Sequence, residues 1–433
     1  MDLDGALEWL RGHINLEADP GARAAGRRLQ RTARLAGLLG DPHRAYPAIH
    51  ITGTNGKGST ARILTRLLVA KGLSVGTYTS PQLERINERA AWNGEPIGDE
   101  ALAEALESIA HVEPMLETPA TYFEVLTVAA FRWFADIAID VAVVEVGLGG
   151  RWDSTNIIDA SVAVVTNVEL DHMDILGDTR LAIAGEKAGI VKPGATLVLG
   201  ETDPELIPVF RDTPAGAIWV RDTDFGCEVN DLAVGGRLLD LWTPAARYPD
   251  VFLPLHGAHQ GANASTALTA AEAFFDAPLD PAVVAEGMAT VENPGRMEVL
   301  GRHPLFILDG AHNPAGAAAA AATLNGEFSA AESRIIVVGL NSGRQPAEML
   351  EALQARRARL VIAAPTPSPR SIDPDDIADA ANALGVEALV TSSVDDAVER
   401  ALGLAGPEDL VFVTGSLYVV GAARSAYRAF VTK

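Results

Sequence analysis

Short apolar runs alternate with longer amphipathic segments from residue 47 to the end of the chain, a pattern typical of parallel α/β architecture. The first run, 47–52, predicts a strand that stops at a glycine-rich turn. After this turn, Ala61, Leu64, Leu67 and Leu68 recur at the spacing of one buried helix face. We predict further strands at 73–79, 140–146, 161–167 and 195–199.

The alternation of apolar runs and amphipathic segments is interrupted in the middle of the chain and then resumes. Residues 221–255 are polar and turn-rich, and we expect them to form a small β excursion. A predicted helix at about 258–275 leads to Asn293-Pro294-Gly295, where Pro and Gly end regular structure. The polyalanine stretch 317–322 is interpreted as a close-packed helix. Strands of a second α/β unit are predicted at 304–309, 334–339, 359–364, 387–391 and 409–414.

Length and composition support two or three globular domains. A chain of 433 residues is too long for one ordinary domain, and we place the predicted domains at 1–293 and 294–433. Hydrophobic residues make up 48% and charged residues 21%, values that exclude a disordered chain. No uncharged apolar run reaches about 18 residues, so we expect no membrane span.

The net charge limits the binding partners that can be expected, and the number of cysteines indicates the cellular compartment. The net charge of -23 argues against a non-specific binder of nucleic acid or anionic membranes, since either needs a basic face. A single cysteine, Cys227, rules out an internal disulfide and suits a reducing cytosol. The amino terminus lacks the basic and apolar regions of a signal peptide. We therefore expect a cytoplasmic monomer that acts on small molecules.

The residues after each predicted strand carry the candidate chemistry, because catalytic loops in parallel sheets lie at the carboxyl ends of strands. The first strand delivers the run Gly53 to Thr60, which includes Lys57. The strict Walker spacing fails, but glycines allow backbone N–H groups to converge on phosphate, and the following helix adds positive potential. Lys57 can reach the β/γ oxygens. We predict nucleotide binding here, in preference to an ordinary β–α turn.

Two later strands end in groups that suit a hard metal ion. Glu145 stands inside the apolar run 141–146, where a carboxylate is costly unless it is paired or metal-bound. His172 follows the strand 161–167, and although a lone histidine is more often structural, its place at a strand tip favours a metal link. Oxygen donors suit Mg²⁺, and the chain lacks the Cys or paired-His spacing of a zinc site.

The second unit offers its own strand-tip residues. Asp309 and His312 directly follow the apolar run 305–308, a position that indicates function by itself. Ser416, after Thr414-Gly415, is a weaker example of the same kind.

Several motifs occur in a single recognisable order. They are Ile51 to Thr60, Thr121-Tyr122-Phe123-Glu124, Glu145 to Asn156, Leu170-Asp171-His172, Glu186 to Ile190, Pro294-Gly295-Arg296 and Asp309 to Pro314. From about residue 28 to Tyr418, the chain resembles the folylpolyglutamate synthase and dihydrofolate synthase family, folate relatives of the Mur ligases. The resemblance implies a P-loop domain like the central domain of Mur ligases, a Rossmann-like carboxyl-terminal domain, and ATP held between them. It further implies a ligase that adds L-glutamate to a folate-type carboxylate through an acyl phosphate.

The resemblance also implies a role for individual residues. Contacts to ATP are implied for Thr54, Asn55, Gly56, Lys57, Gly58, Ser59, Asn263, Arg296 and Asp309. Ser80 and Glu145 would hold one Mg²⁺, and His172 a second. The pterin pocket would be lined by Thr121, Tyr122, Phe123, Glu124, Trp152, Asp153 and Ser154, and glutamate would meet His312 and Ser416. Lys187 matches a lysine that the family carries as a carbamate, which makes the catalytic candidates Lys57, Lys187, His172 and His312.

Without the resemblance, some of these positions have ordinary interpretations. Ser80-Pro81 would be a turn, Asn263 a solvent-facing or capping amide, and Arg296 a surface arginine. Lys187 would be a salt-bridged lysine near a helix end.

The chain departs from the family at three places. Gln82 stands where the family usually has histidine, and Leu340 to Gln345 replaces an Asp-Lys-Asp stretch, where Arg344 could supply the positive charge. The pterin-contacting stretch of dual-function members appears as Gly26-Arg27. These departures leave open whether dihydropteroate is a substrate.

Two other functions compete with this prediction. A Mur-type ligase acting on a UDP-sugar substrate shares the P-loop, but it normally carries an additional amino-terminal domain, for which the 46 residues before Pro47 are too few. A P-loop nucleotide switch would explain Lys57 and Glu145, but it would give Asp309 and His312 no role.

Overall fold

The computed structural model describes residues 1–15, 17 and 29–432, and their contacts divide the chain into two compact units. The first unit consists of Met1–Gln82, Ile86–Pro254 and Gln260–Glu292, and the second of Leu83–Arg85, Leu255–His259 and Asn293–Lys433. The chain therefore enters the second unit three times, twice as a short excursion and finally at Asn293. The hydrophobic pattern gave no sign of the two excursions.

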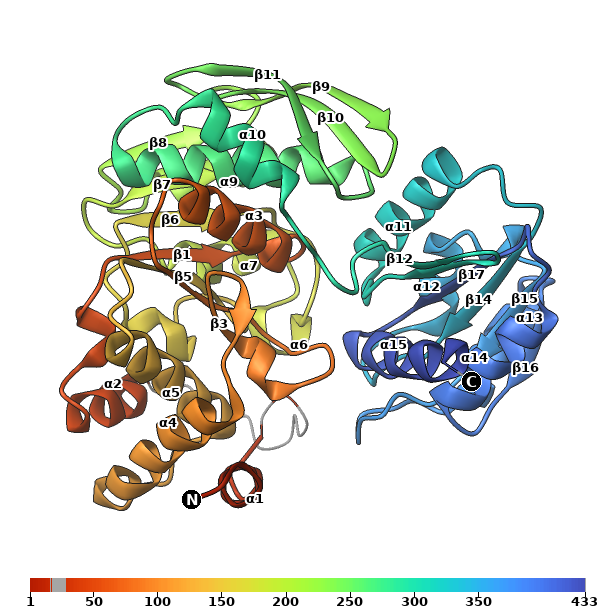
Figure 1. Ribbon diagram of the computed structural model, residues 1–433, viewed down its shortest axis with the longest axis horizontal. Coiled ribbons are helices and arrows are strands. Elements are labelled where there is room, and N and C mark those ends of the chain that lie inside the picture. Colours follow the sequence, from red (N-terminus) through yellow and green to blue (C-terminus); the bar gives the residue numbers. More distant parts are fainter. Residues whose placement is uncertain (16, 18–28, 433) are drawn as a thin grey trace. The chain divides into compact units, whose positions relative to one another are not determined.

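Among the described residues, eight strands of the first unit form one sheet in the order β4-β3-β2-β5-β1-β6-β7-β8 (Figure 1). The strands from β2 to β8 pair in parallel, whereas β3 and β4 add an antiparallel edge. The strands predicted from the apolar runs are present, because a parallel strand covered on both faces is apolar throughout. The bounds are β1 (Ala48–Thr52), β2 (Val75–Tyr78), β3 (Ala90–Trp92), β4 (Glu95–Pro96), β5 (Val141–Glu145), β6 (Val162–Val165), β7 (Thr196–Leu199) and β8 (Ala217–Val220).

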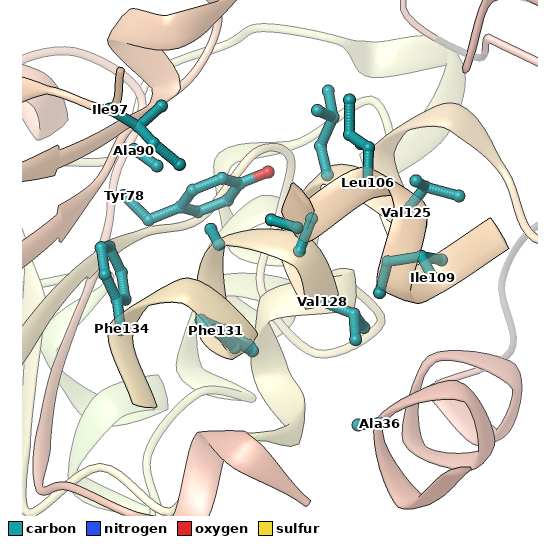
Figure 2. Packing of buried hydrophobic residues seen from close by; sticks show 14 of the residues in the cluster. Ala36, Tyr78, Ala90, Ile97, Leu106, Ile109, Val125, Val128, Phe131 and Phe134 are labelled. Carbon is teal, nitrogen blue, oxygen red and sulfur yellow. The ribbon is translucent and has the colours of Figure 1, made fainter. Parts of the chain in front are cut away.

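Helices cover both faces of this sheet. On one face, Tyr78 of β2 and Val144 of β5 pack with apolar side chains of α4 and α5, including Phe131 and Phe134 (Figure 2). The helix α3 contacts β1, β2 and β5 through its buried face, which contains the four residues predicted from their spacing. The bounds are α1 (Leu3–Arg11), α2 (Leu29–Leu38), α3 (Lys57–Ala70), α4 (Asp99–Val112), α5 (Tyr122–Asp136), α6 (Met173–Leu176), α7 (Arg180–Ala188), α8 (Ile207–Arg211), α9 (His259–Phe275) and α10 (Pro281–Ala289).

The predicted β excursion is an antiparallel sheet in the order β11-β10-β9. Its strands are β9 (Gly226–Ala233), β10 (Gly236–Trp242) and β11 (Arg247–Leu253).

The second unit contains a sheet in the order β12-β13-β17-β14-β15-β16, parallel apart from β12. The helices α11, α12 and α13 pack on one face, and α14 and α15 on the other. The strands are β12 (Glu298–Arg302), β13 (Leu305–Leu308), β14 (Arg334–Val338), β15 (Leu360–Ala363), β16 (Glu387–Val390) and β17 (Leu410–Thr414). The helices are α11 (Pro314–Glu327), α12 (Pro346–Ala352), α13 (Pro374–Ala383), α14 (Val394–Leu404) and α15 (Leu417–Val431). The predicted α/β class is confirmed, and the polyalanine stretch lies in α11.

A glutamate secures each excursion to the second unit. Glu84 accepts hydrogen bonds from Arg424 and from Ser425 Oγ, the latter at 2.7 Å. Glu327 of α11 accepts the Gly257 amide at 2.8 Å, and its second oxygen lies 2.8 Å from His256 Nδ1. These contacts make both excursions integral parts of the second unit.

None of the helices in the described ranges is both long enough and apolar enough to cross a membrane.

Candidate active site

Asn263 of α9 lies against the glycine-rich loop after β1, next to the amino terminus of α3. Gly53 and Gly56 adopt φ values of +151° and +82°. A Cβ on Gly56 would lie 2.5 Å from Asn263 Oδ1, so only glycine fits there without displacing the amide. Because Gly56 is the N-cap and has no side chain, it leaves the first N–H groups of α3 available to an anion. Asn263 therefore lies against the predicted phosphate loop and is not a solvent-facing amide.

The loop is held in place by the end of β6. Asn167 Oδ1 accepts the Asn55 amide at 2.9 Å, and Thr166 Oγ1 donates to the Asn55 carbonyl at 2.6 Å. Lys57 Nζ donates to the carbonyls of Gly53 and Thr54, both at 3.2 Å. The ammonium is thus held over the loop, where a phosphate bound to the α3 amino terminus would meet it.

Ser80 and Glu145 meet beside this loop. Glu145 pairs in register with Ile51 of β1 and is only 5% exposed. Its Oε2 accepts the Ser80 amide at 3.3 Å and lies 3.5 Å from the position that a Cβ on Gly58 would take. The Ser80-Pro81 bond is cis. A carboxylate and a serine beside a phosphate loop are hard donors that fit Mg²⁺, which often keeps water and substrate phosphates as its other ligands.

Within residues 1–15, 17 and 29–432, no group of three or more His, Cys, Asp or Glu side chains is arranged to hold a metal ion. His172 starts α6 with a φ of +49°, and its Nε2 lies 3.8 Å from Asp171 Oδ1. Asp171 is buried and was not a candidate from the sequence.

Lys187, on α7, is a buried lysine near two other charged groups. Only 3% of the residue is exposed. Burial lowers the pKa of Lys187 well below its usual value, Lys57 lowers it further, and Asp171 partly opposes both. A buried amine in this environment favours the neutral form.

The predicted pterin pocket is built on the amino terminus of α5. Thr121 is the N-cap, and the Glu124 side chain accepts the Thr121 amide at 2.7 Å in a capping box. Arg31 of α2 donates to both oxygens of Glu124, at 2.6 and 3.0 Å. Glu124 is therefore held by the cap of α5 and by Arg31. Phe123 packs against Gly147, where a Cβ would lie 2.5 Å from its ring.

The turn that carries Trp152, Asp153 and Ser154 follows β5. Asp153 accepts the amides of Leu148 at 2.9 Å and Thr155 at 3.0 Å. Burial raises the pKa of Asp153, although these hydrogen bonds oppose the shift. Trp152 is half exposed and Ser154 starts a 3₁₀ turn. The aspartate fixes the turn, and Trp152 is the side chain that projects from it.

The carboxyl ends of β13 and β17 bring together the candidates of the second unit. Asp309 accepts the Met297 amide at 2.9 Å and the Ala311 amide at 2.8 Å. Arg296 packs on Gly310, where a Cβ would lie 2.8 Å from its Nη1. His312 Nδ1 lies 3.0 Å from the Gly310 carbonyl. Asp309 therefore joins the turn that carries Arg296 to the loop that carries His312.

Ser416 is the N-cap of α15 and accepts the Val419 amide at 3.2 Å. The next loop of this edge, between β14 and α12, carries Arg344. Gly26-Arg27 lies outside the described residues.

Sequence reasoning missed Arg31, Arg89 and Asp171. Arg89 is buried and donates through Nε to Gln82 Oε1 at 2.6 Å. Asp171 belongs to the motif Leu170-Asp171-His172, and its place beside a candidate histidine could have identified it as a site residue. Nothing in the local pattern distinguished Arg31 or Arg89 from a surface arginine.

Known protein families and relatives match this chain over most of its length. The Mur ligase middle domain matches residues 51–271, and the Mur ligase glutamate ligase domain matches residues 295–417. The chain is 38% identical to the dihydrofolate synthase/folylpolyglutamate synthase of Mycobacterium tuberculosis, over 92% of this chain and 90% of the relative. It is 35% identical to the folylpolyglutamate synthase of Lacticaseibacillus casei, over 91% and 93% of the two chains.

Solved structures match over nearly the full length. The M. tuberculosis folylpolyglutamate synthase complexed with ADP and AMPPCP has a TM-score of 0.90 at 36% identity, covering 98% of this chain and 99% of that one. A bifunctional folylpolyglutamate synthase/dihydrofolate synthase with Mn, AMPPNP and L-glutamate bound has a TM-score of 0.85 at 30% identity, covering 99% and 98%.

Proposed function

The chain belongs to the Mur ligase family, in the branch of the folylpolyglutamate and dihydrofolate synthases, and we propose on this basis that it joins L-glutamate to a folate-type carboxylate at the expense of ATP. One observation carries the proposal: Ser80 and Glu145 meet beside the phosphate loop, where Lys57 and Asn263 also lie. A UDP-sugar ligase and a nucleotide switch fit the comparisons less well, since the relatives are named for folate chemistry.

The first step is phosphoryl transfer. A carboxylate oxygen of the folate attacks the γ-phosphorus of ATP, the bond to the β,γ-bridging oxygen breaks, and ADP leaves. Both reactants are anions, so catalysis consists mainly of positioning and charge neutralisation. In our proposal Lys57 and the α3 amino terminus hold the phosphates. Magnesium, when bound to Glu145 and Ser80, would neutralise charge on the phosphate oxygens.

The second step forms the amide. The amine of L-glutamate attacks the acyl carbon, the C–N bond forms, inorganic phosphate leaves, and the amine loses a proton. We assign His312 and Ser416 to the incoming glutamate. Asp309 and Arg296 are assigned to ATP, and Asp309 also orients Arg296 through the Met297 amide.

Lys187 is proposed to be carbamylated. The neutral amine would add to CO₂ with loss of one proton and form a carbamate, which places a negative charge beside Lys57 where the amine carried none. The support is a buried lysine whose pKa is lowered by burial and then by Lys57. The carbamate would then supply oxygens near His172, to which we assign a second Mg²⁺.

The pterin pocket and the two domains complete the assignment. Thr121 to Glu124, with Trp152 to Ser154, would form the pterin pocket, in which Glu124 and Asp153 act through the turns that they fix. The two halves, residues 1–293 and 294–433, would act as ATP-binding and glutamate-ligase domains of a cytoplasmic monomer.

Release of ADP tests the function. The protein would be incubated with ATP and Mg²⁺ and either dihydropteroate or a reduced folate, each with and without L-glutamate. We expect glutamate-dependent ADP release with at least one of the two pterin substrates. Release that ignores both glutamate and pterin would refute the proposal and favour a nucleotide switch.

A further inference from the structure

Arg89 is a buried charge that the proposed reaction does not use. Only 2% of the residue is exposed. Its Nη1 and Nη2 donate to the two oxygens of Glu17 at 3.0 and 2.6 Å, and its Nε donates to Gln82 Oε1 at 2.6 Å. Burial alone would lower the pKa of Arg89, but Glu17 more than offsets this, and the pKa is raised. The guanidinium is therefore charged and fixed by three hydrogen bonds.

Arg89 also holds the turn that contains Ser80 from both sides. Its backbone carbonyl accepts the Thr79 amide at 2.9 Å, one residue before Ser80. Its side chain binds Gln82, two residues after Ser80. Between these two attachments, the Ser80 amide donates to Glu145 Oε2. A single residue thus brackets the turn that meets the carboxylate.

The opposite side of Arg89 faces the predicted pocket. Its guanidinium carbon lies 5.7 Å from the centre of the Tyr122 ring, within the range of a cation–π contact. The next residue, Ala90, belongs to the apolar cluster shown in Figure 2. Arg89 therefore contacts Tyr122 and the turn that contains Ser80 at the same time.

We propose that Arg89 is a positioning residue that holds the Ser80 turn against Glu145 through Gln82, and so sets the metal site. This inference rests on the assignment of Ser80 and Glu145 to Mg²⁺ in the proposed function. Gln82 is suited to the task because an amide oxygen accepts a hydrogen bond at every pH, whereas an imidazole nitrogen accepts only when it is neutral. Gln82 therefore accepts from the permanently charged guanidinium of Arg89 whatever the pH.

A purely structural role would give a different result. If Arg89 served only to pair Glu17 inside the protein, its contact with Gln82 would not affect metal binding. Loss of the Arg89 side chain would then change thermal stability alone. If Arg89 positions the turn, loss of the Gln82 contact changes how the site holds a divalent ion.

Mn²⁺ binding in the presence of ADP separates these possibilities, since it needs neither folate nor turnover. Electron paramagnetic resonance would give the Mn²⁺ affinity of the wild type and of Q82L and R89K. Lysine keeps the charge of Arg89 but cannot donate to Gln82 and both oxygens of Glu17 in a fork. We expect both variants to bind Mn²⁺ about tenfold more weakly, with Tm nearly unchanged in Q82L. Both variants should also release ADP more slowly at limiting Mg²⁺, and excess Mg²⁺ should recover part of this lost activity.

Two matched controls keep the result specific. R132K alters an exposed arginine paired with Asp136, and Q354L removes an exposed amide that accepts a hydrogen bond from Asn325. Neither should change Mn²⁺ affinity. Unchanged Mn²⁺ affinity in folded Q82L and R89K would overturn the inference, and so would a loss of Tm without a loss of Mn²⁺ binding. A wild type that binds Mn²⁺ with ADP but shows no glutamate-dependent ADP release would refute the proposed function and leave this inference standing.

Discussion

Replacing Lys187 by methionine separates the cost of burying an amine from the chemistry of that amine. Methionine has nearly the length of lysine but no charge, so the buried space stays filled. Since Lys187 is 3% exposed and burial lowers its pKa well below the usual value, the wild type without CO₂ carries an amine that is costly to bury in its charged form. Replacing buried ionic groups with apolar ones of similar volume is often neutral or stabilises by about 1–4 kcal/mol. We expect a gain in this range for K187M, and each kcal/mol should raise Tm by roughly 2–4 °C.

The difference in the free energy of unfolding between the wild type and K187M should depend on pH, in a direction set by the pKa of Lys187. The folded-state pKa of Lys187 lies below the unfolded value of 10.5. Between these two values the unfolded chain binds more protons, so the free energy of unfolding rises with pH, by at most about 1.4 kcal/mol per unit for one group. In protein depleted of CO₂, the wild type should therefore be least stable relative to K187M at low pH, and the contribution of the Lys187 titration to this difference should vanish above pH 10.5.

Bicarbonate provides the test for the carbamate. At neutral pH, added bicarbonate should raise the Tm of the wild type by mass action and leave K187M unchanged. K192M is the matched control, because Lys192 is only half buried and donates to the Asn156 carbonyl at 2.9 Å. K187A should lose glutamate-dependent ADP release, and formate or acetate should restore part of it. A K187M variant that melts no higher than CO₂-depleted wild type, together with a wild type indifferent to bicarbonate, would refute the reasoning.

Other substitutions test the rest of the site. K57A should reduce turnover on the order of 10³-fold at saturating ATP and Mg²⁺ with Tm unchanged, and more than a tenth of wild-type turnover would contradict its assignment to phosphate. H312A should raise the KM for glutamate and leave ATP affinity nearly unchanged, whereas D309A should weaken ATP binding; titration of both ligands would expose exchanged phenotypes. R31M leaves the buried carboxylate of Glu124 without its ion-pair partner. It should cost about 3 kcal/mol in urea unfolding, the low end for a broken buried pair because Arg31 remains 15% exposed, and a loss below about 1 kcal/mol would argue against the pair as a stabilising contact.

The sequence pattern predicted most of the parallel strands because they are apolar runs, as in β5, where only Glu145 interrupts the pattern, but it missed the parallel strand β8. It also missed β3 and β4, which have three and two residues and depend on antiparallel pairing, β3 with β2 and β4 with β3. Sheet order was also beyond reach, since nothing local specifies that β1 lies between β5 and β6.

The candidate site divides in the same way. Glu145 could be predicted because a carboxylate in an apolar run is conspicuous. Arg89 could not, because its partners Glu17 and Gln82 are 72 and 7 residues away and only the fold brings them together. For Asp309, the family implied a contact with ATP, whereas the structure adds that its oxygens hold two backbone amides.

The excursions at Leu83–Arg85 and Leu255–His259 have a consequence for exchanging parts between relatives. A chimera joined once, at Asn293, would take the second unit from one protein and both excursions from another. Its Arg424 would then have to accept whatever residue a foreign chain offers at position 84, and its Glu327 whatever stands at position 256. The second unit therefore consists of three separate stretches of sequence, and a working chimera requires all three to come from the same parent protein.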